Sequence, residues 1–358
     1  MKKLSFLFFV IILNKIHSQP LPPDAQTLYN ECYNADVMMG QYVLNHNGQV
    51  LSTADGKSFY LKYIPAGATP SLTPMLVTLH GSGGRAQVEY FNWYQYCAAK
   101  GIGLIALQWY RGAASISPYN YFPDDTLYTY IDTALKRLKY PANKAMYHGF
   151  SRGSARSYAV AFKDVQPGGS NYFCTILSNA GKPDSLYPLY TAINSGTFGH
   201  TFYSGKKWAM YCGADDPDNG QSGCQGMNMA KNWVISNGGT VGIYIQGPSP
   251  QGHDGFHTVP AYIDSTLNYY LQCFNGTAGL KELKKKESIT LYPNPTKDIL
   301  NINSEEYLKE NVTITNVLGI IIKNIKIEGY TSKINISDLA NGIYFTAFNS
   351  QKTKIIKN

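Results

Sequence analysis

The sequence predicts an α/β domain with a mostly parallel sheet, followed by a small all-β sandwich domain. Between about Ser58 and Cys273, short apolar runs alternate with amphipathic stretches, which is typical of repeated strand–helix units. The charged stretch from Lys281 to Glu287 then interrupts the apolar pattern. After it, residues 289–358 carry short β-type runs between Gly-rich and Asn-Gly turns, and this pattern favours a sandwich of short strands.

The N-terminus has the organisation of a secretory signal. Lys2 and Lys3 precede an apolar run from Leu4 to Leu13, and a short segment ending at Ser18 follows. We therefore expect a signal peptide over residues 1–18, cleaved after Ser18. The apolar run is too short to anchor the chain in a bilayer, and no later stretch approaches the roughly 20 apolar residues that a spanning helix needs. Export is expected, and a transmembrane segment is not.

Residues 19–275 are predicted to form the α/β domain, which is long enough to bury its own core. The expected strands are 59–64, 75–80, 102–109, 145–148, 173–178, 208–212 and 241–245. The expected helices are 87–99, 125–138, 154–163, 226–236 and 259–271. Residues 276–288 are expected to be a linker, because they are too polar for a core.

Charge and cysteine usage narrow the functional classes. The formal charge of +8 is spread thinly, and aromatic residues do not interleave with basic clusters, so a nucleic-acid partner is not expected. Six cysteines in an exported chain make disulfides reasonable. Cys212 and Cys224 flank one predicted loop and are the expected pair, while buried free thiols remain the alternative for several cysteines. No pair has the spacing of zinc ligands.

The candidate nucleophile is Ser151. Gly149-Phe150-Ser151-Arg152-Gly153 fits the pattern G-x-S-x-G, a turn that lifts a serine hydroxyl above the end of a sheet. The local context agrees, because residues 144–148 are expected to form a strand that enters the turn and residues 154–162 a helix that leaves it. The glycines keep the backbone thin where the strained serine must fit.

An oxyanion hole is expected from two backbone amides. An apolar strand ends in His80-Gly81-Ser82-Gly83-Gly84, where the glycines allow the chain to bend so that an N–H faces the reaction centre. Ser82 is the expected donor and Gly83 the second choice. The N–H of Arg152, just after the nucleophile, would supply the other hydrogen bond. His80 is interpreted as a structural residue of this loop.

The candidate base is His253. A triad on this kind of fold has the chain order Ser, acid, His. Only His200, His253 and His257 follow Ser151, and His200 lies before the only convincing loop with an acid. His253 is favoured over His257 because it lies in a glycine-flanked segment. His257 has the alternative interpretation of a helix-cap or surface residue.

The candidate acid is Asp216, with Asp215 and Asp218 as alternatives. Asp216 comes three residues after the glycine that ends a predicted strand and directly before Pro217. Its carboxylate would hold His253 in the productive tautomer. The spacing of Asp216, Asp218 and Gly220 faintly resembles a calcium loop but departs from the EF-hand pattern, so a metal site is not expected.

Residues 58–273 resemble the secreted α/β-hydrolase esterases that include feruloyl esterases, acetylxylan esterases and polyhydroxybutyrate depolymerases. The resemblance rests on these segments: His80 to Gly84, Gly149 to Gly153, Gly213 to Pro217 and Gly252-His253. It implies an α/β-hydrolase fold that cleaves carboxylic esters through an acyl-enzyme and needs no cofactor. The substrate would be a polysaccharide-linked acyl group or a polyester. Arg152 and Ser154 depart from what is usual around the serine of this family.

Substrate specificity is expected to come from aromatic loops above the sheet. Trp109, Tyr110 and Tyr121 are the candidate substrate-binding residues, with the surrounding stretch from Tyr119 and the insertion over residues 181–205. A peptidase or amidase on the same fold is the alternative enzyme, because a triad does not distinguish esters from amides by sequence. A catalytically inactive surface protein that uses the fold for binding is the alternative from another class.

Residues 289–358 resemble the C-terminal sorting domain of the type IX secretion system of Bacteroidetes. The motifs that carry the resemblance are Leu291 to Thr296, Asp298 to Ile302, Asn316 to Gly319, Ile336 to Leu339, Asn341 to Tyr344 and Lys354 to Lys357. The resemblance implies that the type IX machinery is a partner, and that the protein crosses the periplasm to be secreted or held at the cell surface. This segment contains no His and no Cys, so catalysis is not expected there.

Overall fold

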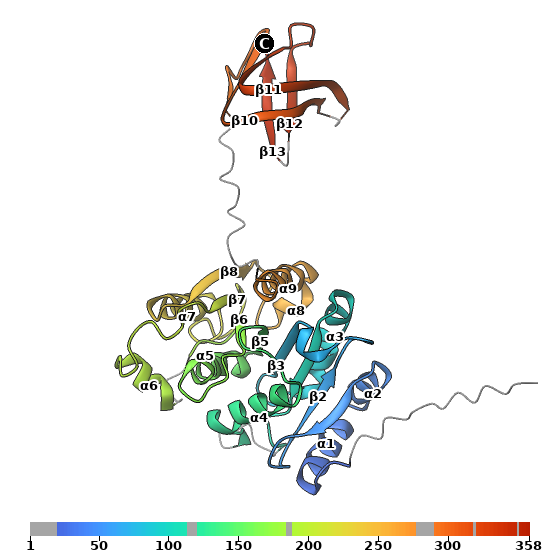
Figure 1. Cartoon of the computed structure of the whole chain (residues 1–358), viewed down its shortest axis with the longest axis vertical. Helices are drawn as coiled ribbons and strands as arrows, with labels where there is room; N and C mark the ends of the chain where they lie inside the picture. Colours follow the sequence, from blue (N-terminus) through green and yellow to red (C-terminus); the bar gives the residue numbers. More distant parts are fainter. Residues whose placement is uncertain (1–19, 113–119, 184–187, 277–289, 318–319, 349–350) are drawn as a thin grey trace, which may run out of the picture. The chain divides into compact units, whose positions relative to one another are not determined.

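The computed structural model describes residues 20–112, 120–183, 188–276, 290–317, 320–348 and 351–358. The chain divides into two compact units, one that ends at Thr277 and one that begins at Ala278 (Figure 1). The predicted signal peptide, residues 1–18, lies outside the described residues, as does all but the first residue of the predicted linker, residues 276–288.

An eight-stranded, mostly parallel sheet organises the first unit, as predicted. Its strands lie in the order β1-β2-β4-β3-β5-β6-β7-β8. Near one edge, β2 pairs antiparallel with both β1 and β4, and the pairs from β4 to β8 are parallel. The strand bounds are β1 Gln49–Ser52, β2 Phe59–Tyr63, β3 Met75–Leu79, β4 Gly103–Leu107, β5 Ala145–Phe150, β6 Phe173–Asn179, β7 Lys207–Gly213 and β8 Thr240–Gly247. The seven predicted strands correspond to β2–β8, and β1 is additional.

Helices cover both faces of this sheet (Figure 1). Their bounds are α1 Pro23–Ala35, α2 Val37–Asn45, α3 Ala86–Lys100, α4 Asp124–Arg137, α5 Arg152–Val165, α6 Pro188–Asn194, α7 Cys224–Ser236, α8 Gly255–Thr258 and α9 Pro260–Phe274. Neighbouring residues of β3 illustrate the two faces, because side chains alternate along a strand. Val77 packs in a cluster with residues of α4, α5 and α7, whereas Leu76 packs with residues of α1, α3 and α9.

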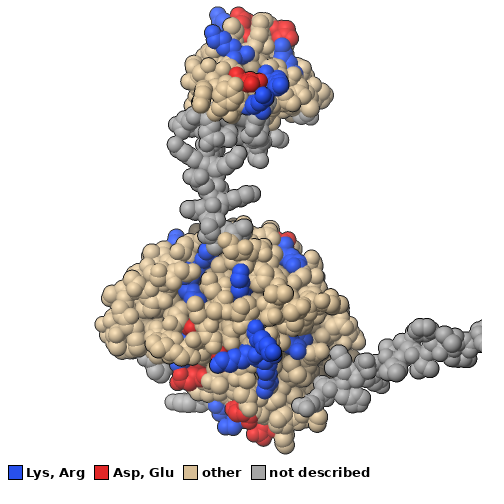
Figure 2. All heavy atoms as spheres, viewed as in Figure 1, with Lys and Arg blue, Asp and Glu red and all other residues tan. Residues whose placement is uncertain are grey.

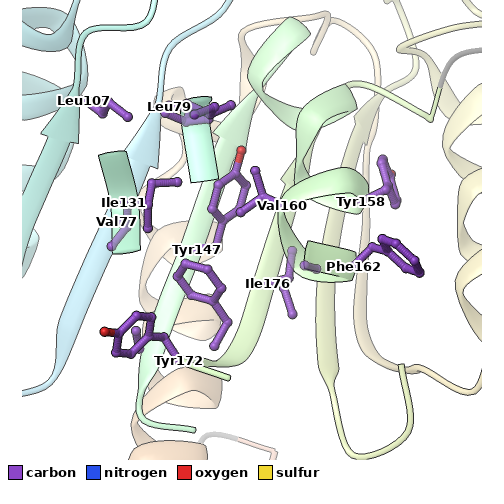
Figure 3. Close-up of a cluster of buried hydrophobic side chains, with 14 of the residues drawn as sticks. Val77, Leu79, Leu107, Ile131, Tyr147, Tyr158, Val160, Phe162, Tyr172 and Ile176 are labelled. Atoms are coloured by element: carbon purple, nitrogen blue, oxygen red, sulfur yellow. The ribbon is translucent and has the colours of Figure 1, made fainter. Parts of the chain in front are cut away.

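Figure 3 shows part of the cluster that contains Val77, where Tyr147 of β5 lies between Val77 and Val160 of α5. These side chains are fully or almost fully buried. Burial of an aliphatic or aromatic side chain of this size contributes about 1.5–3 kcal/mol to folding. The tight packing therefore fixes β5 and α5, the two elements that meet at Ser151.

Helices α1, α2, α6 and α8 were not predicted from the sequence. Helix α1 buries only Ala25, Leu28 and Cys32, so its apolar stripe is narrow. A local signal does exist for α2, because the side chain of Asp36 accepts a hydrogen bond from the N–H of Met39 at 3.1 Å. An aspartate in that position is a common helix N-cap.

The second unit is an antiparallel five-stranded all-β domain. Its strands are β9 Thr290–Tyr292, β10 Ile299–Asn316, β11 Ile321–Asn335, β12 Gly342–Phe348 and β13 Gln351–Lys357. The pairing of β10 with β11 shifts between Asn303 and Leu308, and only the part of β10 beyond this shift pairs with β12. Buried aliphatic residues such as Ile302 and Ile314 form a small core of its own. The predicted separate all-β domain is confirmed.

The surface carries charge in small separate groups. In the view of Figure 2, Lys and Arg form several clusters among mostly uncharged atoms, without a continuous basic stripe. Within the described part of the chain, no helix combines the length and the apolar character that crossing a bilayer requires.

Candidate active site

Ser151 occupies a strained turn between β5 and α5. Its backbone has φ 53° and ψ −115°, outside the regions that a residue with a side chain normally adopts. A Cβ atom on Gly149 would lie 2.1 Å from the carbonyl oxygen of Gly153, and one on Gly153 would lie 2.6 Å from that of Leu79. Both glycines of the motif are therefore required for the chain to make this turn.

His253 bridges Ser151 and Asp216. Its Nε2 atom lies 2.8 Å from Oγ of Ser151, and its Nδ1 atom lies 2.7 Å from Oδ2 of Asp216. An ionised carboxylate only accepts hydrogen bonds, so Nδ1 carries the proton and Nε2 is free to accept the hydroxyl proton of the serine. The structure brings the three predicted residues together in the order Ser151, His253, Asp216.

Asp216 is held in a fixed orientation. The residue is 6% exposed, and its Oδ1 atom accepts hydrogen bonds from the N–H of Asp218 at 2.9 Å and from Oγ–H of Ser222 at 2.8 Å. These bonds leave Oδ2 for His253. A buried carboxylate with its other oxygen satisfied is well suited to orient an imidazole ring.

The side chains of the alternative acids and of the alternative base have other partners. Asp215 accepts a hydrogen bond from Oγ–H of Ser249, and Asp218 accepts one from the N–H of Gln221. The ring of His257 packs edge-on against Trp93, and its pKa is lowered to about 4 by burial and by the nearby His148. Among the described residues, none of these three side chains makes a hydrogen bond to the Ser151–His253 pair.

Two backbone amides are available beside Ser151. Within the described residues, the N–H groups of Ser82 and Arg152 have no hydrogen-bond acceptor, whereas the N–H of Gly83 donates to the hydroxyl oxygen of Tyr121 at 2.7 Å. Arg152 is the first residue of α5, where a backbone N–H has no partner within the helix. Ser82 and Arg152 thus remain candidates for an oxyanion hole, and Gly83 is already bonded.

His80 is buried below this loop. Its Nδ1 atom lies 2.8 Å from the carbonyl oxygen of Gly81, and the indole N–H of Trp109 donates to the His80 carbonyl at 2.9 Å. Burial lowers the pKa of His80 to about 4. These contacts fit a neutral residue that holds the loop in position.

A cavity of about 470 Å³ opens over the serine. Its lining includes Ser82, Ser151, Arg152, Arg156, Ala155, Ala180, Gly181, Asp216, Pro217, Asp218, Gln221, Ser222 and His253. A cavity of this size suits a small molecule or one part of a polymer chain.

The aromatic residues predicted to bind substrate lie outside this lining. Trp109 is fully buried and Tyr121 is 3% exposed, and their rings pack 4.5 Å apart between centroids. Tyr110 packs beside Tyr121 at 5.0 Å. Trp109 and Tyr121 therefore offer little surface to a ligand, whereas Tyr110 is partly exposed. Tyr119 lies outside the described residues, as do residues 184–187 of the predicted insertion.

A buried polar cluster behind the serine was missed by the sequence reasoning. In the described part of the chain, one group of residues has ligand atoms close enough to hold a metal ion, within 4.8 Å of one another: Glu89, His148 and His257. Nδ1 of His148 already lies 2.8 Å from Oγ1 of Thr78 and 3.1 Å from the indole nitrogen of Trp93, so a metal ion there would displace existing polar contacts. No local signal could reveal the cluster, because its members come from α3, β5 and α8.

Glu89 is stabilised as a carboxylate within this cluster. Burial by itself raises its pKa, but the hydrogen bond and the nearby charge of His148 outweigh burial, and the pKa of Glu89 lies below its usual value. His148 also contacts the side chain of Asn179, whose backbone oxygen accepts the N–H of Ser151. The cluster therefore supports the turn that carries the serine.

Cys212 and Cys224 form a disulfide, as predicted, with a Cα–Cα distance of 4.9 Å. The bridge closes the segment that contains Asp216. Cys32, Cys97, Cys174 and Cys273 are free and buried.

The mostly parallel sheet, with Ser151 on the turn after β5, defines an α/β-hydrolase fold. Residues 290–358 match the family described as the secretion system C-terminal sorting domain. This match confirms the predicted sorting tail, and with it export by type IX secretion to the cell surface or beyond. No curated protein matches the chain by sequence.

Solved structures with a similar fold include several esterases. A thermostable esterase matches at 14% identity with a TM-score of 0.44, over 63% of this chain and 62% of its own. The Bacillus cereus carboxylesterase matches at 14% identity with a TM-score of 0.45, over 66% of this chain and 100% of its own. A hyperthermophilic esterase from the archaeon Pyrobaculum calidifontis matches at 12% identity with a TM-score of 0.47, over 71% and 94%. The chain thus spans less than two thirds of the thermostable esterase.

Proposed function

We propose that this protein is a secreted serine esterase that cleaves carboxylic esters through an acyl-enzyme on Ser151. The observation that carries the proposal is the hydrogen-bonded series from Oγ of Ser151 through His253 to Asp216, with distances of 2.8 Å and 2.7 Å. The series opens onto a cavity of about 470 Å³. The sorting tail supports an extracellular substrate.

The proposed reaction has two halves. In the first, Nε2 of His253 takes the proton from Ser151 as Oγ attacks the ester carbonyl, and the imidazolium then gives that proton to the leaving alcohol. In the second, His253 takes a proton from water as the water oxygen attacks the acyl-enzyme. The imidazolium then returns that proton to Oγ of Ser151 as the acyl–Oγ bond breaks and the acid leaves. The N–H groups of Ser82 and Arg152 would stabilise the oxyanion of each tetrahedral intermediate, an effect worth about 3–4 kcal/mol per donor in a comparable enzyme.

Acyl groups linked to polysaccharides, or polyesters, are the proposed substrates, in line with the family that residues 58–273 resemble. A peptidase or amidase would use the same three residues. A catalytically inactive binding protein would have no need for Ser151 in a strained turn beside an oriented histidine, and this arrangement favours an enzyme.

The test is hydrolysis of p-nitrophenyl esters of increasing chain length, methyl ferulate and acetylated xylan, together with a peptide p-nitroanilide panel. Wild type is expected to turn over at least one ester, and Ser151→Ala to turn over none. Ser236→Ala is the matched control, because Ser236 is an exposed serine on α7 away from the cavity. A fluorophosphonate should add one adduct mass to wild type and none to Ser151→Ala.

If wild type turned over only the peptide anilides, the result would contradict the esterase proposal and indicate a peptidase. No turnover together with no fluorophosphonate adduct on wild type would contradict a serine hydrolase of either kind and would favour a binding protein.

A further inference from the structure

The guanidinium of Arg152 lies beside the serine and has no carboxylate partner among the described residues. Arg152 lines the same cavity as Ser151 and His253. Within the described residues, no Asp or Glu lies within ion-pair distance of its guanidinium. The side chain of Arg152 is half-buried, and a guanidinium in this position, with no carboxylate beside it, suits a ligand of the opposite charge.

The side chain of Arg152 is held in place by neutral groups. Its Nε–H donates to Oγ of Ser82 at 3.1 Å, and its guanidinium carbon lies 4.6 Å from the centroid of the Tyr121 ring. Tyr121 is in turn fixed, because its hydroxyl accepts the N–H of Gly83 and its ring packs against Trp109. A fixed guanidinium loses less side-chain entropy when it binds a ligand.

The Nη groups of Arg152 remain available. The Nε–H is bonded to Ser82, and no hydrogen bond from either Nη atom to the rest of the described chain is present. Two Nη–H groups at the end of a guanidinium match the two oxygens of a carboxylate. With a neutral ester in the cavity, the Nη–H groups of Arg152 would donate their hydrogen bonds to water.

The other charges around the cavity have partners or face solvent. Arg156 is 7% exposed and donates to Oδ1 of Asp124 at 2.8 Å, so its charge is balanced. Asp216 is bonded to His253, and Asp218 is exposed and accepts the N–H of Gln221. Arg152 is thus the cation of this cavity that has no ionic partner among the described residues.

We propose that Arg152 binds a carboxylate of the substrate, so that the preferred ester carries an anionic group close to the bond that is cleaved. This inference rests on the proposed esterase function and specifies its substrate class. The carboxylate belongs either to the acyl part or to the alcohol part of the ester, since Arg152 and Ser151 line the same cavity. The guanidinium acts by binding, and Ser151 and His253 perform the chemistry.

Two matched pairs of esters separate these possibilities. The first pair is p-nitrophenyl hydrogen adipate and its methyl ester, which differ only in a charge on the acyl part. The second pair is 4-acetoxybenzoate and methyl 4-acetoxybenzoate, which differ in a charge on the leaving group. Their difference in leaving-group basicity cancels when the ratio of a variant is compared with that of wild type. For each pair the measured quantity is kcat/KM for the anionic ester divided by kcat/KM for the neutral ester, so that any loss common to both members cancels.

Wild type is expected to prefer the anionic member of at least one pair by about tenfold or more, chiefly through a lower KM. Arg152→Gln should lower that ratio by about tenfold, and Arg152→Lys should restore part of it. Arg85→Gln is the matched control, because Arg85 lies at the start of α3 and does not line the cavity. Its ratio should equal that of wild type.

A wild-type ratio of one or less in both pairs, with the neutral esters turned over, would overturn this inference and leave the esterase proposal intact. In the pair whose anionic member wild type prefers, an equal loss for both members in Arg152→Gln would also overturn it, because the side chain would then act on the reaction common to both esters. If no ester is turned over and Ser151 takes no fluorophosphonate, both proposals fail together.

Discussion

The Nε2 atom of His253 lies 2.8 Å from Oγ of Ser151, although 102 residues separate the two along the chain. The loop that carries His253 reaches this position because β7 ends in a glycine. A Cβ atom on Gly213 would lie 2.2 Å from the carbonyl oxygen of Gly252, and the hydroxyl of Tyr211 donates to that same oxygen at 3.0 Å. Close packing between the ends of β7 and the loop after β8 therefore sets the position of the histidine.

His253→Ala should lower kcat/KM for the best ester by about 10⁴-fold or more, because nothing else would take the serine proton. His257→Gln should stay within a few-fold of wild type, since the ring of His257 packs against Trp93. The measurement is steady-state hydrolysis by folded protein, with circular dichroism as the check on folding. Equal losses in the two variants would contradict the assignment of the base.

Asp216→Asn should lower kcat by about 10³- to 10⁴-fold, because an amide can donate to Nδ1 and stabilise the unproductive tautomer of His253. Asp215→Asn is the matched control. In the wild-type chain, the carboxylate of Asp215 contacts Ser249, so the activity of Asp215→Asn should change only a few-fold. If Asp215→Asn were the more damaging substitution, Asp216 would not be the orienting acid.

Removal of the disulfide in a Cys212→Ala/Cys224→Ala variant should lower the free energy of unfolding of the first unit by about 3 kcal/mol, from the entropy of the loop that the bridge closes. It should also lower kcat, because Asp216 lies within that loop. Urea unfolding with and without a reductant measures the first effect. Reduced wild type should behave as the variant does, and a variant as stable as oxidised wild type would contradict the prediction.

Stability should fall in acid because two buried histidines are neutral in the folded chain. Burial lowers the pKa of both His80 and His257 to about 4, below the unfolded value near 6.5. The unfolded chain binds more protons between these values, so stability is complete above about pH 6.5 and is lost as the pH falls toward 4. Each histidine should account for about 2 kcal/mol between pH 7 and pH 5.

This loss can be followed by tryptophan fluorescence during urea unfolding, because all four tryptophans lie in the first unit. His257→Gln should show a shallower dependence of stability on pH than wild type. An unchanged dependence would mean that His257 titrates normally in the folded protein.

Deletion of residues 278–358 should abolish export to the cell surface while the first unit keeps its ester hydrolysis, because the two units have separate cores. The check is fractionation of a host with type IX machinery, followed by ester hydrolysis in each fraction. The deleted protein should collect in the periplasm. Surface activity equal to that of the full chain would contradict a sorting role for these residues.

Features that depend on contiguous residues could be predicted from the amino-acid sequence. Apolar runs and their turns predicted the strands from β2 to β8. The motif G-x-S-x-G located the turn of Ser151 between a predicted strand and a predicted helix. The motifs from Leu291 onward identified the sorting tail. These signals are local, because backbone conformation, side-chain periodicity and short motifs are properties of neighbouring residues. Helices α1 and α2 were missed because their apolar stripes are narrow or lack a clear pattern.

The tertiary structure alone decided which distant groups meet. The sequence left two histidines and three aspartates as candidates, and in the fold His253 and Asp216 are the ones that form a hydrogen-bonded series with Ser151. The N–H of Gly83 donates to the hydroxyl of Tyr121. The fold buried Trp109 and Tyr121, and it placed Arg152 in the cavity with no ionic partner among the residues that the structure describes. Each of these outcomes depends on the paths of loops that begin on different strands, and side-chain packing fixes those paths only when the whole sheet has formed.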